Sequence, residues 1–320
     1  MAAALVGLGS NLGDRSQHLD SAVELLRQTP QVDGVITSVY HASQPAGGPP
    51  GQGEFLNAAA RVETSLSPAA LLAALQGIED RLGRVRGQQW AERLIDLDLL
   101  LYDQLEWQTP TLTLPHPRMG FRRFVLKTAA EIAPDWVFPI NGWTLHQLLE
   151  YSFATPKYLA IVSTAGDDEP EIFSRLATQP GCRLIRRTNF PQIFPVARVA
   201  VLENNYLASF ALQKISSVLQ AALVPAGVGW LVSDFWLPSG GSALADEGSG
   251  DRITGPAAIL SLPRPRLVVI LASGADEAAK DNFHLRQLSR QPTCGPVLWL
   301  SSAEPAAAEN EVLAALQAID

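Results

Sequence analysis

The order of the apolar patterns in the first third of the chain constrains the fold most strongly. The predicted elements run strand, helix, strand, strand, helix, strand, over residues 3–8, 14–28, 34–41, 55–63, from 67 onward, and 92–103. Ser67 and Pro68 supply an N-cap and a first helical residue for the second helix. This order predicts a ferredoxin-like α+β sandwich, an antiparallel sheet with helices on one face.

A different pattern begins after residue 157. Continuous apolar segments, typical of strands buried on both faces of a parallel sheet, alternate with helical segments. The strands are predicted at 158–163, 266–273 and 296–302, and the helices at 171–177 and 307–319. The Gly/Ser/Asp-rich stretch 238–252 is predicted to be a mobile loop. We therefore expect two domains, 1–152 and 157–320, the second an α/β parallel-sheet domain.

Composition excludes several classes of function. The net charge of −8 disfavours nucleic acid as a partner, and no apolar stretch approaches the ~18 residues that a membrane span needs. Two cysteines, Cys182 and Cys294, fit a reducing compartment better than a disulfide scaffold. The first residues lack the pattern of a secretory signal. We expect a cytoplasmic protein.

A local basic cluster stands out on this acidic chain. Residues 81–93 (RLGRVRGQQWAER) carry four arginines and a single glutamate, Glu92. This pattern indicates binding of a small polyanion such as a nucleotide, or equally a solvated loop.

Two aspartates interrupt the apolar segment ERLIDLDLLLYD at 92–103. On a strand Asp96 and Asp98 share one face, with Cα atoms roughly 6.6 Å apart, while Leu97 and Leu99 point to the other face. Two such carboxylates can hold Mg²⁺ when substrate phosphates complete the coordination shell. An isolated pair of this kind could also simply face solvent.

The neighbouring motifs favour phosphoryl transfer. Trp90 and Arg93 lie just upstream of the aspartates, and LPHPRMGFRR at 114–123 brings His116 together with Arg122 and Arg123. Catalysis at such a site depends mainly on positioning and charge neutralisation.

Together these motifs resemble 6-hydroxymethyl-7,8-dihydropterin pyrophosphokinase, over about residues 3–150. The resemblance rests on GLGSNLGDR (7–15), GGPPGQGEFLNAA (47–59), IEDRLGRVR (78–86), W-x-x-R-x-I-D-L-D-L-L (90–100) and LPHPRM-x-x-R-x-F-V-L…EIAP (114–134). It implies transfer of a pyrophosphoryl group from ATP to a pterin alcohol in folate biosynthesis. The pterin hydroxyl attacks the β-phosphorus, and AMP leaves.

The resemblance also implies roles for individual residues. Asp96 and Asp98 would bind two Mg²⁺ ions. Phe55 and Phe124 would stack on the pterin and Asn57 would read its edge; without the motifs, plain core packing would explain both rings. Backbone groups near Ser43, Ala46 and Gly47 would complete pterin recognition.

The resemblance also implies that further residues surround ATP. The predicted phosphate-neutralising arginines are Arg84, Arg86, Arg93 and Arg122. The positions expected around the nucleotide are Gln76, Glu79, Trp90, Thr113 and His116. His116 could donate to a phosphate oxygen, or be a structural histidine beside two prolines.

The chain departs from the family pattern at three places. Ala91-Glu92 replaces the usual Gly-Pro between Trp90 and Arg93, Ser43 replaces a threonine, and Thr128 stands where many relatives have proline. These changes bear on loop closure and rate more than on the reaction.

Residues 157–320 have a fainter resemblance to deoxynucleoside kinases, which implies a P-loop-kinase-like fold. A working phosphate loop is G-x-x-x-x-G-K-[ST]. Here the matching stretch 163–170 is STAGDDEP, in which Glu169 takes the place of the lysine. We expect a non-catalytic relic that serves dimer contact, stabilisation of the first domain or partner binding. An active nucleoside kinase with an unusual phosphate site is the alternative.

Two alternatives to an active pyrophosphokinase remain open from the sequence. One is a non-catalytic pterin- or nucleotide-binding regulatory module that lost turnover through Ala91-Glu92. The other is an assembly subunit whose main role lies in the C-terminal half.

Overall fold

The computed structural model of the chain describes residues 1–84, 91–154, 157–163, 171–179, 182–185, 230–233, 265–272, 290, 295–301 and 305–319. The chain divides into two compact units, Met1–Ser152 with Asn310–Asp320, and Phe153–Glu309.

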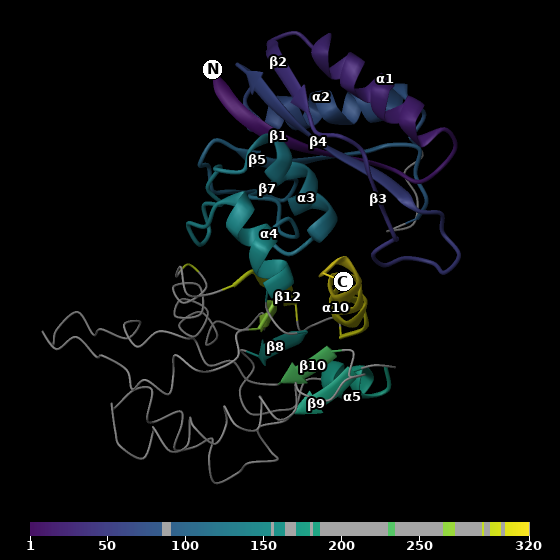
Figure 1. The fold of residues 1–320 in the computed structure, drawn as a ribbon, viewed down its shortest axis with the longest axis vertical. Helices are drawn as coiled ribbons and strands as arrows, with labels where there is room; N and C mark the ends of the chain where they lie inside the picture. The colour runs from purple at the N-terminus through teal and green to yellow at the C-terminus, as the bar shows by residue number, and fades with distance from the viewer. Residues whose placement is uncertain are drawn as a thin grey trace, which may run out of the picture. The chain divides into compact units, whose positions relative to one another are not determined.

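The first unit is built on a five-stranded antiparallel sheet (Figure 1). Its elements are β1 (Ala2–Ser10), α1 (Arg15–Arg27), β2 (Val32–Thr37), β3 (His41–Ser43), β4 (Phe55–Thr64), α2 (Pro68–Arg81), β5 (Asp96–Tyr102), β6 (Trp107–Gln108), β7 (Thr113–Leu114), α3 (Arg123–Ile132) and α4 (Leu145–Ala154). The sheet order is β2-β4-β1-β5, and the short β3 also pairs with β4. The predicted antiparallel α+β order is confirmed, although the predicted strand 34–41 is divided between β2 and β3.

Local side-chain bonds fix where the first two helices begin. The Asp14 carboxylate accepts a hydrogen bond from the Gln17 N–H at 3.1 Å, and the Ser67 hydroxyl accepts one from the Ala70 N–H at 3.3 Å. Each bond satisfies a backbone donor that the first helical turn leaves without a partner. The predicted Ser67 cap is confirmed.

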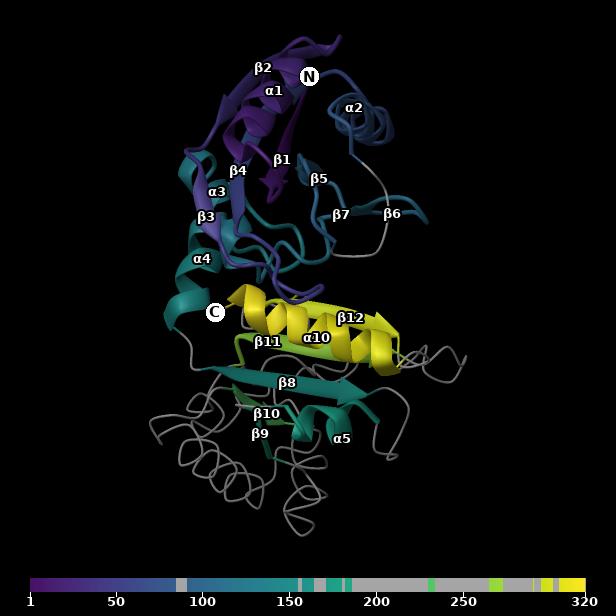
Figure 2. The same ribbon diagram turned by 90° about the vertical axis from the view of Figure 1, so that its right-hand side faces the viewer.

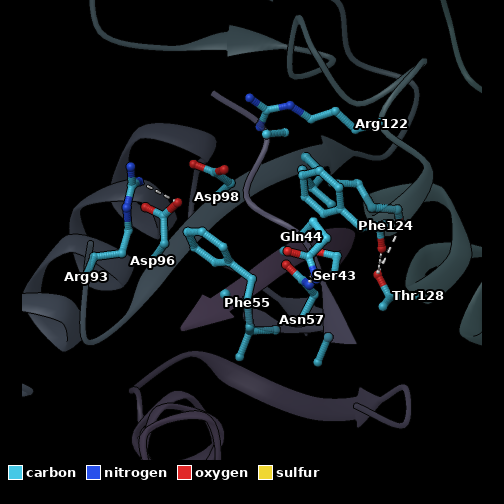
Figure 3. Close-up of a pocket in the computed structure, with 17 residues that line it drawn as sticks. Ser43, Gln44, Phe55, Asn57, Arg93, Asp96, Asp98, Arg122, Phe124 and Thr128 are labelled. Carbon is cyan, nitrogen blue, oxygen red and sulfur yellow. Dashed lines mark hydrogen bonds and ion pairs between the residues drawn. The ribbon is translucent and has the colours of Figure 1, made fainter. Parts of the chain in front are cut away.

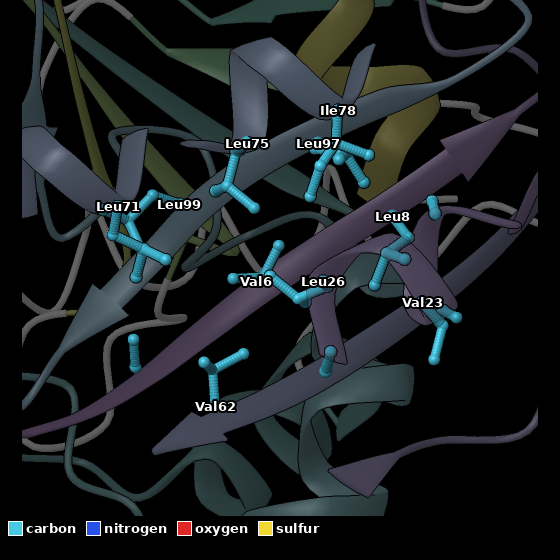
Figure 4. Packing of buried hydrophobic residues seen from close by; sticks show 14 of the residues in the cluster. Val6, Leu8, Val23, Leu26, Val62, Leu71, Leu75, Ile78, Leu97 and Leu99 are labelled. Atoms are coloured by element: carbon cyan, nitrogen blue, oxygen red, sulfur yellow. The ribbon is translucent and has the colours of Figure 1, made fainter. Parts of the chain in front are cut away.

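One face of the sheet packs against α1 and α2 (Figure 4). Val6 from β1, Leu75 from α2 and Leu97 from β5 are each buried there at 4% exposure or less. Leu97 and Leu99 therefore point into this core, and the alternation of the strand sends the intervening aspartates to the opposite face.

The opposite face of the sheet is also covered, so the expectation of helices on one face only is wrong. Leu5 from β1 and Leu101 from β5 are buried with Leu126 of α3 and Leu148 of α4. Residues 104–150 thus supply a second apolar layer, and the layer leaves one end of this face open for polar side chains.

The second unit has a parallel sheet, as predicted, and its described residues form five strands of it (Figure 2). Its elements are β8 (Tyr158–Ser163), α5 (Glu171–Ala177), β9 (Cys182–Ile185), β10 (Trp230–Ser233), β11 (Leu267–Ala272) and β12 (Val297–Ser301). The last helix, α10 (Pro305–Ile319), is divided between the two units after Glu309. The strand order is β12-β11-β8-β10-β9, so the first strand in sequence lies at the centre. The segments 164–170 and 238–252 lie outside the described residues.

Candidate active site

A cavity opens on the α3 face of the first unit's sheet (Figure 3). Its lining comes from β1, β3, β4, β5 and the beginning of α3, together with the loop after β3. The lining residues are Gly7, Leu8, Gly9, Ser43, Gln44, Ala46, Phe55, Asn57, Ala58, Arg93, Asp96, Asp98, Leu100, Arg122, Phe124, Val125 and Thr128.

The antiparallel register aligns the polar residues of this cavity. Gly9 of β1 is paired with Asn57 of β4 on one side and with Asp96 of β5 on the other, and Gly7 is paired with Asp98. Directly paired residues project to the same face of a sheet. With strands about 4.8 Å apart, Asn57 and Asp96 lie about 10 Å apart across the bare backbone of Gly9.

The absence of a side chain at Gly9 creates the floor of the cavity. A Cβ atom there would lie 3.7 Å from both Asn57 Oδ1 and the Phe55 ring. These are ordinary van der Waals distances, so the strand could accept a side chain at position 9. Such a side chain would fill the space between the Asn57 amide and the Phe55 ring. The cavity floor is therefore a strip of backbone, which suits a flat ligand.

Asn57 presents an acceptor to this cavity. Its side-chain nitrogen donates to the His41 carbonyl oxygen at 3.2 Å and to the Ser43 hydroxyl oxygen at 2.9 Å. The amide has two N–H donors, and both are used in these two bonds. Its Oδ1, directed over Gly9, is left to accept a hydrogen bond from a bound molecule.

Phe55 and Phe124 line the cavity from β4 and from the first turn of α3 (Figure 3). The Arg122 guanidinium carbon lies 5.7 Å from the centroid of the Phe124 ring, within the range of a cation–π contact. The Thr128 hydroxyl donates to the carbonyl oxygens of Phe124 and Val125, which ties down the turn that carries this ring. The two rings are thus available as stacking surfaces.

Asp96 is held between two arginines. Arg84 Nη1 lies 2.8 Å from one carboxylate oxygen, and Arg93 Nη1 lies 2.8 Å from the other. Burial, and after it the neighbouring negative charge of Asp98, raise the pKa of Asp96 in spite of the arginines. An additional cation at these two carboxylates would relieve that repulsion.

Glu79 lies behind this strand rather than in the cavity. Its side chain is 3% exposed, accepts a hydrogen bond from the Leu97 N–H at 2.7 Å and pairs with Arg84. Burial raises the pKa of the Glu79 carboxyl, while the bond from Leu97 and the charge of Arg84 oppose the rise. Glu79 therefore fixes the start of β5 and the position of Arg84.

His116 is kept neutral by its surroundings. Burial, together with the positive charges of Arg122 and Arg118, lowers the His116 pKa to about 3. Its Nδ1 atom accepts a hydrogen bond from the Arg118 N–H at 3.2 Å, so the neutral ring carries its proton on Nε2. The same burial lowers the Arg122 pKa to about 10, and Arg122 stays charged at neutral pH.

The cavity brings together nine of the predicted site residues: Ser43, Ala46, Phe55, Asn57, Arg93, Asp96, Asp98, Arg122 and Phe124. It does not include Gly47, Gln76, Glu79, Arg84, Thr113 or His116 among its lining residues. Arg86 and Trp90 lie outside the described residues.

Sequence reasoning missed the roles of Gly7, Gly9 and Gln44 in the lining. Successive residues of β1 face opposite sides of the sheet. Because the apolar Val6 and Leu8 face the core, the sequence alone could have placed Gly7 and Gly9 on the other face. Pairing β1 with the aspartate strand would have placed them beside the carboxylates.

The donor set fits magnesium held jointly by protein and substrate. No cluster of three or more His, Cys, Asp or Glu side chains suited to a metal occurs within the described ranges. Two carboxylates with arginines beside them instead match a cation whose remaining ligands are phosphate oxygens and water. A stacking cavity next to such a site defines a class: phosphoryl-transfer enzymes that act on a flat heterocycle.

Comparison with known proteins narrows this class to one family. The family model for 7,8-dihydro-6-hydroxymethylpterin-pyrophosphokinase (HPPK) matches residues 5–134. The 2-amino-4-hydroxy-6-hydroxymethyldihydropteridine pyrophosphokinase of Synechocystis sp. is 42% identical over 147 residues, 46% of this chain and 74% of that protein. The Haemophilus influenzae protein of the same name is 40% identical over 161 residues, 50% of this chain and 99% of its own. The chain belongs to the HPPK family.

Its activity is therefore ATP-dependent pyrophosphoryl transfer to 6-hydroxymethyl-7,8-dihydropterin in folate biosynthesis. Among solved structures, a Plasmodium falciparum HPPK-DHPS wild type with pteroate matches with a TM-score of 0.38 at 9% identity, covering 99% of this chain and 79% of that one. A similarity this low assigns nothing to the second unit.

Substitution of Gly9 should affect pterin binding selectively. In Gly9→Val the new side chain fills the space between Asn57 and Phe55, and we expect pterin affinity to fall at least tenfold, about 1.4 kcal/mol. Affinity for a non-hydrolysable ATP analogue should change less than about threefold, since the branched residue suits a strand. Equilibrium titrations of both ligands test this, and equal losses for the two would contradict it.

The neutral His116 should make stability depend on pH. The unfolded chain takes up a proton on this ring near pH 6.5, whereas the folded chain takes it up only near pH 3. The free energy of unfolding therefore falls as pH decreases below 6.5, by at most about 1.4 kcal/mol per pH unit for this group.

His116→Asn removes this titration and keeps an oxygen that can accept from the Arg118 N–H. Urea titrations at pH 7 and pH 5 should show a larger loss of stability for the wild type than for the variant, by at most about 2 kcal/mol. Identical losses would show that His116 titrates normally in the folded protein.

Proposed function

We propose that this cavity is where the pterin and the ATP phosphates meet. The alignment of Asn57, Gly9 and Asp96 across three paired strands carries the proposal. A pterin stacked between Phe55 and Phe124 over Gly9 would offer its N–H edge to Asn57 Oδ1. Its hydroxymethyl group would then point toward the carboxylates of β5.

Asp96 and Asp98 would hold two Mg²⁺ ions through their carboxylates. The bound ions supply neutralisation of the phosphate charge and orientation of the β-phosphorus. The protein's own contribution is positioning: stacking and the Asn57 bond fix the attacking hydroxyl, and the sheet fixes the carboxylates. Ser43, Ala46 and Gly47 complete the pterin loop in this proposal.

The arginines change partners in the proposed reaction. Arg84 and Arg93 both contact Asp96, and Arg122 lies on the far side of the cavity over Phe124. With a cation bound at Asp96, phosphate oxygens would become the preferred partners of Arg84 and Arg93. Arg86 is proposed for the same role by resemblance alone.

His116 would donate its Nε2 proton to a phosphate oxygen. Because its Nδ1 already accepts from the Arg118 N–H, donation is the only hydrogen bond that Nε2 can make in the neutral ring. Gln76, Trp90 and Thr113 are proposed to surround the nucleotide, and Glu79 would act through Arg84 and the Leu97 backbone.

Removal of the Asp98 charge should stop turnover while leaving the pterin pocket intact. For Asp98→Asn we expect AMP release to fall at least about 100-fold, the usual cost of losing one preorganised electrostatic contact. Pterin affinity without nucleotide should change less than about threefold. Asp33→Asn, which removes an exposed carboxylate on β2, is the matched control and should retain activity. Near-wild-type AMP release by Asp98→Asn would exclude the proposed metal role.

We further propose that the second domain, over 157–320, is a degenerate deoxynucleoside-kinase-like domain. Its parallel sheet with β8 at the centre and apolar strands supports this interpretation. Asp167, Asp168 and Glu169 would repel phosphates in the stretch that follows β8. The proposed use is dimer contact, stabilisation of the first domain or binding of a partner. None of the described helices could cross a bilayer. We propose a cytoplasmic location on the separate ground that two cysteines fit a reducing compartment.

The number of nucleotide sites tests this second proposal. Titration of the whole chain with Mg²⁺ and a non-hydrolysable ATP analogue should give one site per chain. The Asp98→Asn variant should bind the analogue more weakly at that site. A second magnesium-dependent site unaffected by Asp98→Asn would show that the second domain still binds nucleotide.

A further inference from the structure

Glu131 stands in the last turn of α3, at the beginning of the sequence EIAP (131–134), and does not line the cavity. The helix dipole disfavours a carboxylate in a last turn, so α3 by itself gives no reason for this residue. Both carboxylate oxygens have partners outside the helix. Oε2 accepts a hydrogen bond from the Val39 N–H at 3.3 Å, and Oε1 contacts His41 Nε2.

The two partners of Glu131 belong to the corner between β2 and β3, residues 38–41. Both strands pair with β4, and Val39 lies outside either strand. The Glu131 carboxylate therefore serves the Val39 N–H in place of a strand partner. Because a carboxylate only accepts hydrogen bonds, His41 donates from Nε2. Glu131 thus ties this corner of the sheet to the end of α3.

His41 leads directly to the amide of the cavity. It is paired with Asn57 across β3 and β4, so both side chains project to the α3 face of the sheet. The His41 carbonyl oxygen accepts from Asn57 Nδ2 at 3.2 Å, and the Ser43 hydroxyl accepts from the same nitrogen at 2.9 Å. A displacement of β3 relative to α3 therefore moves the groups that orient Asn57.

The other end of α3 carries one of the two rings of the cavity. Phe124, Thr128 and Glu131 are spaced four and three residues apart, which places them on one face of the helix. Glu131 lies about 10 Å along the helix axis from Phe124. The opposing ring, Phe55, stands on β4, where it is paired with Ser43 of β3 (Figure 3). The Glu131 contacts therefore join the helix of one ring to the strands beneath the other.

We propose that Glu131 is a positioning residue that sets the separation between α3 and the strands β3 and β4, and with it the width of the slot between Phe124 and Phe55. This deepens the proposed function and rests on it, since the slot is where the pterin is proposed to stack. A gap of roughly 0.5–1 Å already removes a quarter to a half of the dispersion attraction between surfaces in contact. A slightly wider slot therefore binds a flat ring much less tightly.

The phosphate side of the cavity is anchored by different contacts. Asp96 and Asp98 lie on β5, which pairs with β1, and Arg93 bonds Asp96 at 2.8 Å. Arg122 directly precedes α3 and would move with the helix, so nucleotide binding should change slightly rather than not at all. The expected signature of losing Glu131 is a selective loss of pterin affinity.

Two dissociation constants measured on the whole chain test this selectivity. One is that of α,β-methylene ATP with Mg²⁺, and the other is that of 6-hydroxymethylpterin, followed by its fluorescence at a saturating concentration of the nucleotide analogue. Glu131→Ala should weaken pterin binding about tenfold, the order of magnitude for losing a hydrogen bond to a charged group. Binding of the nucleotide analogue should weaken by less than about threefold.

A conservative variant and a matched control separate positioning from general stability. In Glu131→Gln the new amide can accept from the Val39 N–H and donate to Nε2 of a neutral His41, so pterin affinity should stay within about threefold of the wild type. Asp20→Ala removes the carboxylate of α1 that accepts from the Tyr40 hydroxyl at 2.5 Å, which loosens the same corner from the other face of the sheet. This control should lower the melting temperature and keep the pterin affinity.

A purely structural role for Glu131 would lower the melting temperature of Glu131→Ala and leave its pterin affinity unchanged, which overturns the proposal. Equal losses for pterin and nucleotide do the same, as do a pterin loss of the same size in Asp20→Ala and a Glu131→Gln variant as weak as Glu131→Ala. If Glu131→Ala does not fold, His41→Ala replaces it, because this variant keeps the carbonyl oxygen that holds Asn57. It should show a smaller selective loss, and unchanged pterin affinity would refute the role of Glu131.

Phe124→Ala distinguishes failure of this proposal from failure of the proposed function. Weak pterin binding by Phe124→Ala together with normal binding by Glu131→Ala rejects only the positioning role. Wild-type affinity in Phe124→Ala would show that the pterin does not stack in this slot, and would reject the proposed placement and the role of Glu131 together.

Discussion

The pairing of β1 with strands on both sides is the interaction on which the rest of the first unit depends. One side of β1 buries Val6 and Leu8 under α1 and α2, and this apolar burial stabilises the sheet. The other side leaves Gly7 and Gly9 beneath a cavity. Because the register is fixed by the buried side, the positions of Asn57 and Asp96 across Gly9 are fixed with it.

Charge in the site is balanced between groups of opposite sign that lie close together. Asp96 is buried beside Asp98, which raises its pKa, yet two arginines contact its oxygens. Glu79 behind the strand orients Arg84, and His116 is neutral because it is buried and lies near the positive charges of Arg122 and Arg118. In the proposed reaction, the carboxylates of Asp96 and Asp98 would bind a divalent cation, and the guanidinium groups of Arg84 and Arg93 would bind phosphate.

Much of the fold of the first unit and part of the site could be predicted from the sequence, because local sequence patterns determine them. The Ser67 cap gave the start of α2, and strand alternation gave the shared face of Asp96 and Asp98. The second helical layer could not be predicted from periodicity, because α3 and α4 cover a face that the β-α-β-β-α-β pattern alone leaves open. The buried position of Glu79 and the contacts of Glu131 depend on segments more than ten residues away in sequence, which no local pattern contains.

The backbone floor at Gly9 has a consequence for inhibition. Proteins usually escape a competitive inhibitor by enlarging or exchanging a side chain that touches the inhibitor but not the substrate. Here the floor at Gly9 has no side chain to exchange, and three of the lining residues, Phe55, Asn57 and Phe124, are those proposed to hold the substrate itself. A compound that stays within the outline of the pterin would leave the enzyme few single substitutions that confer resistance and preserve turnover.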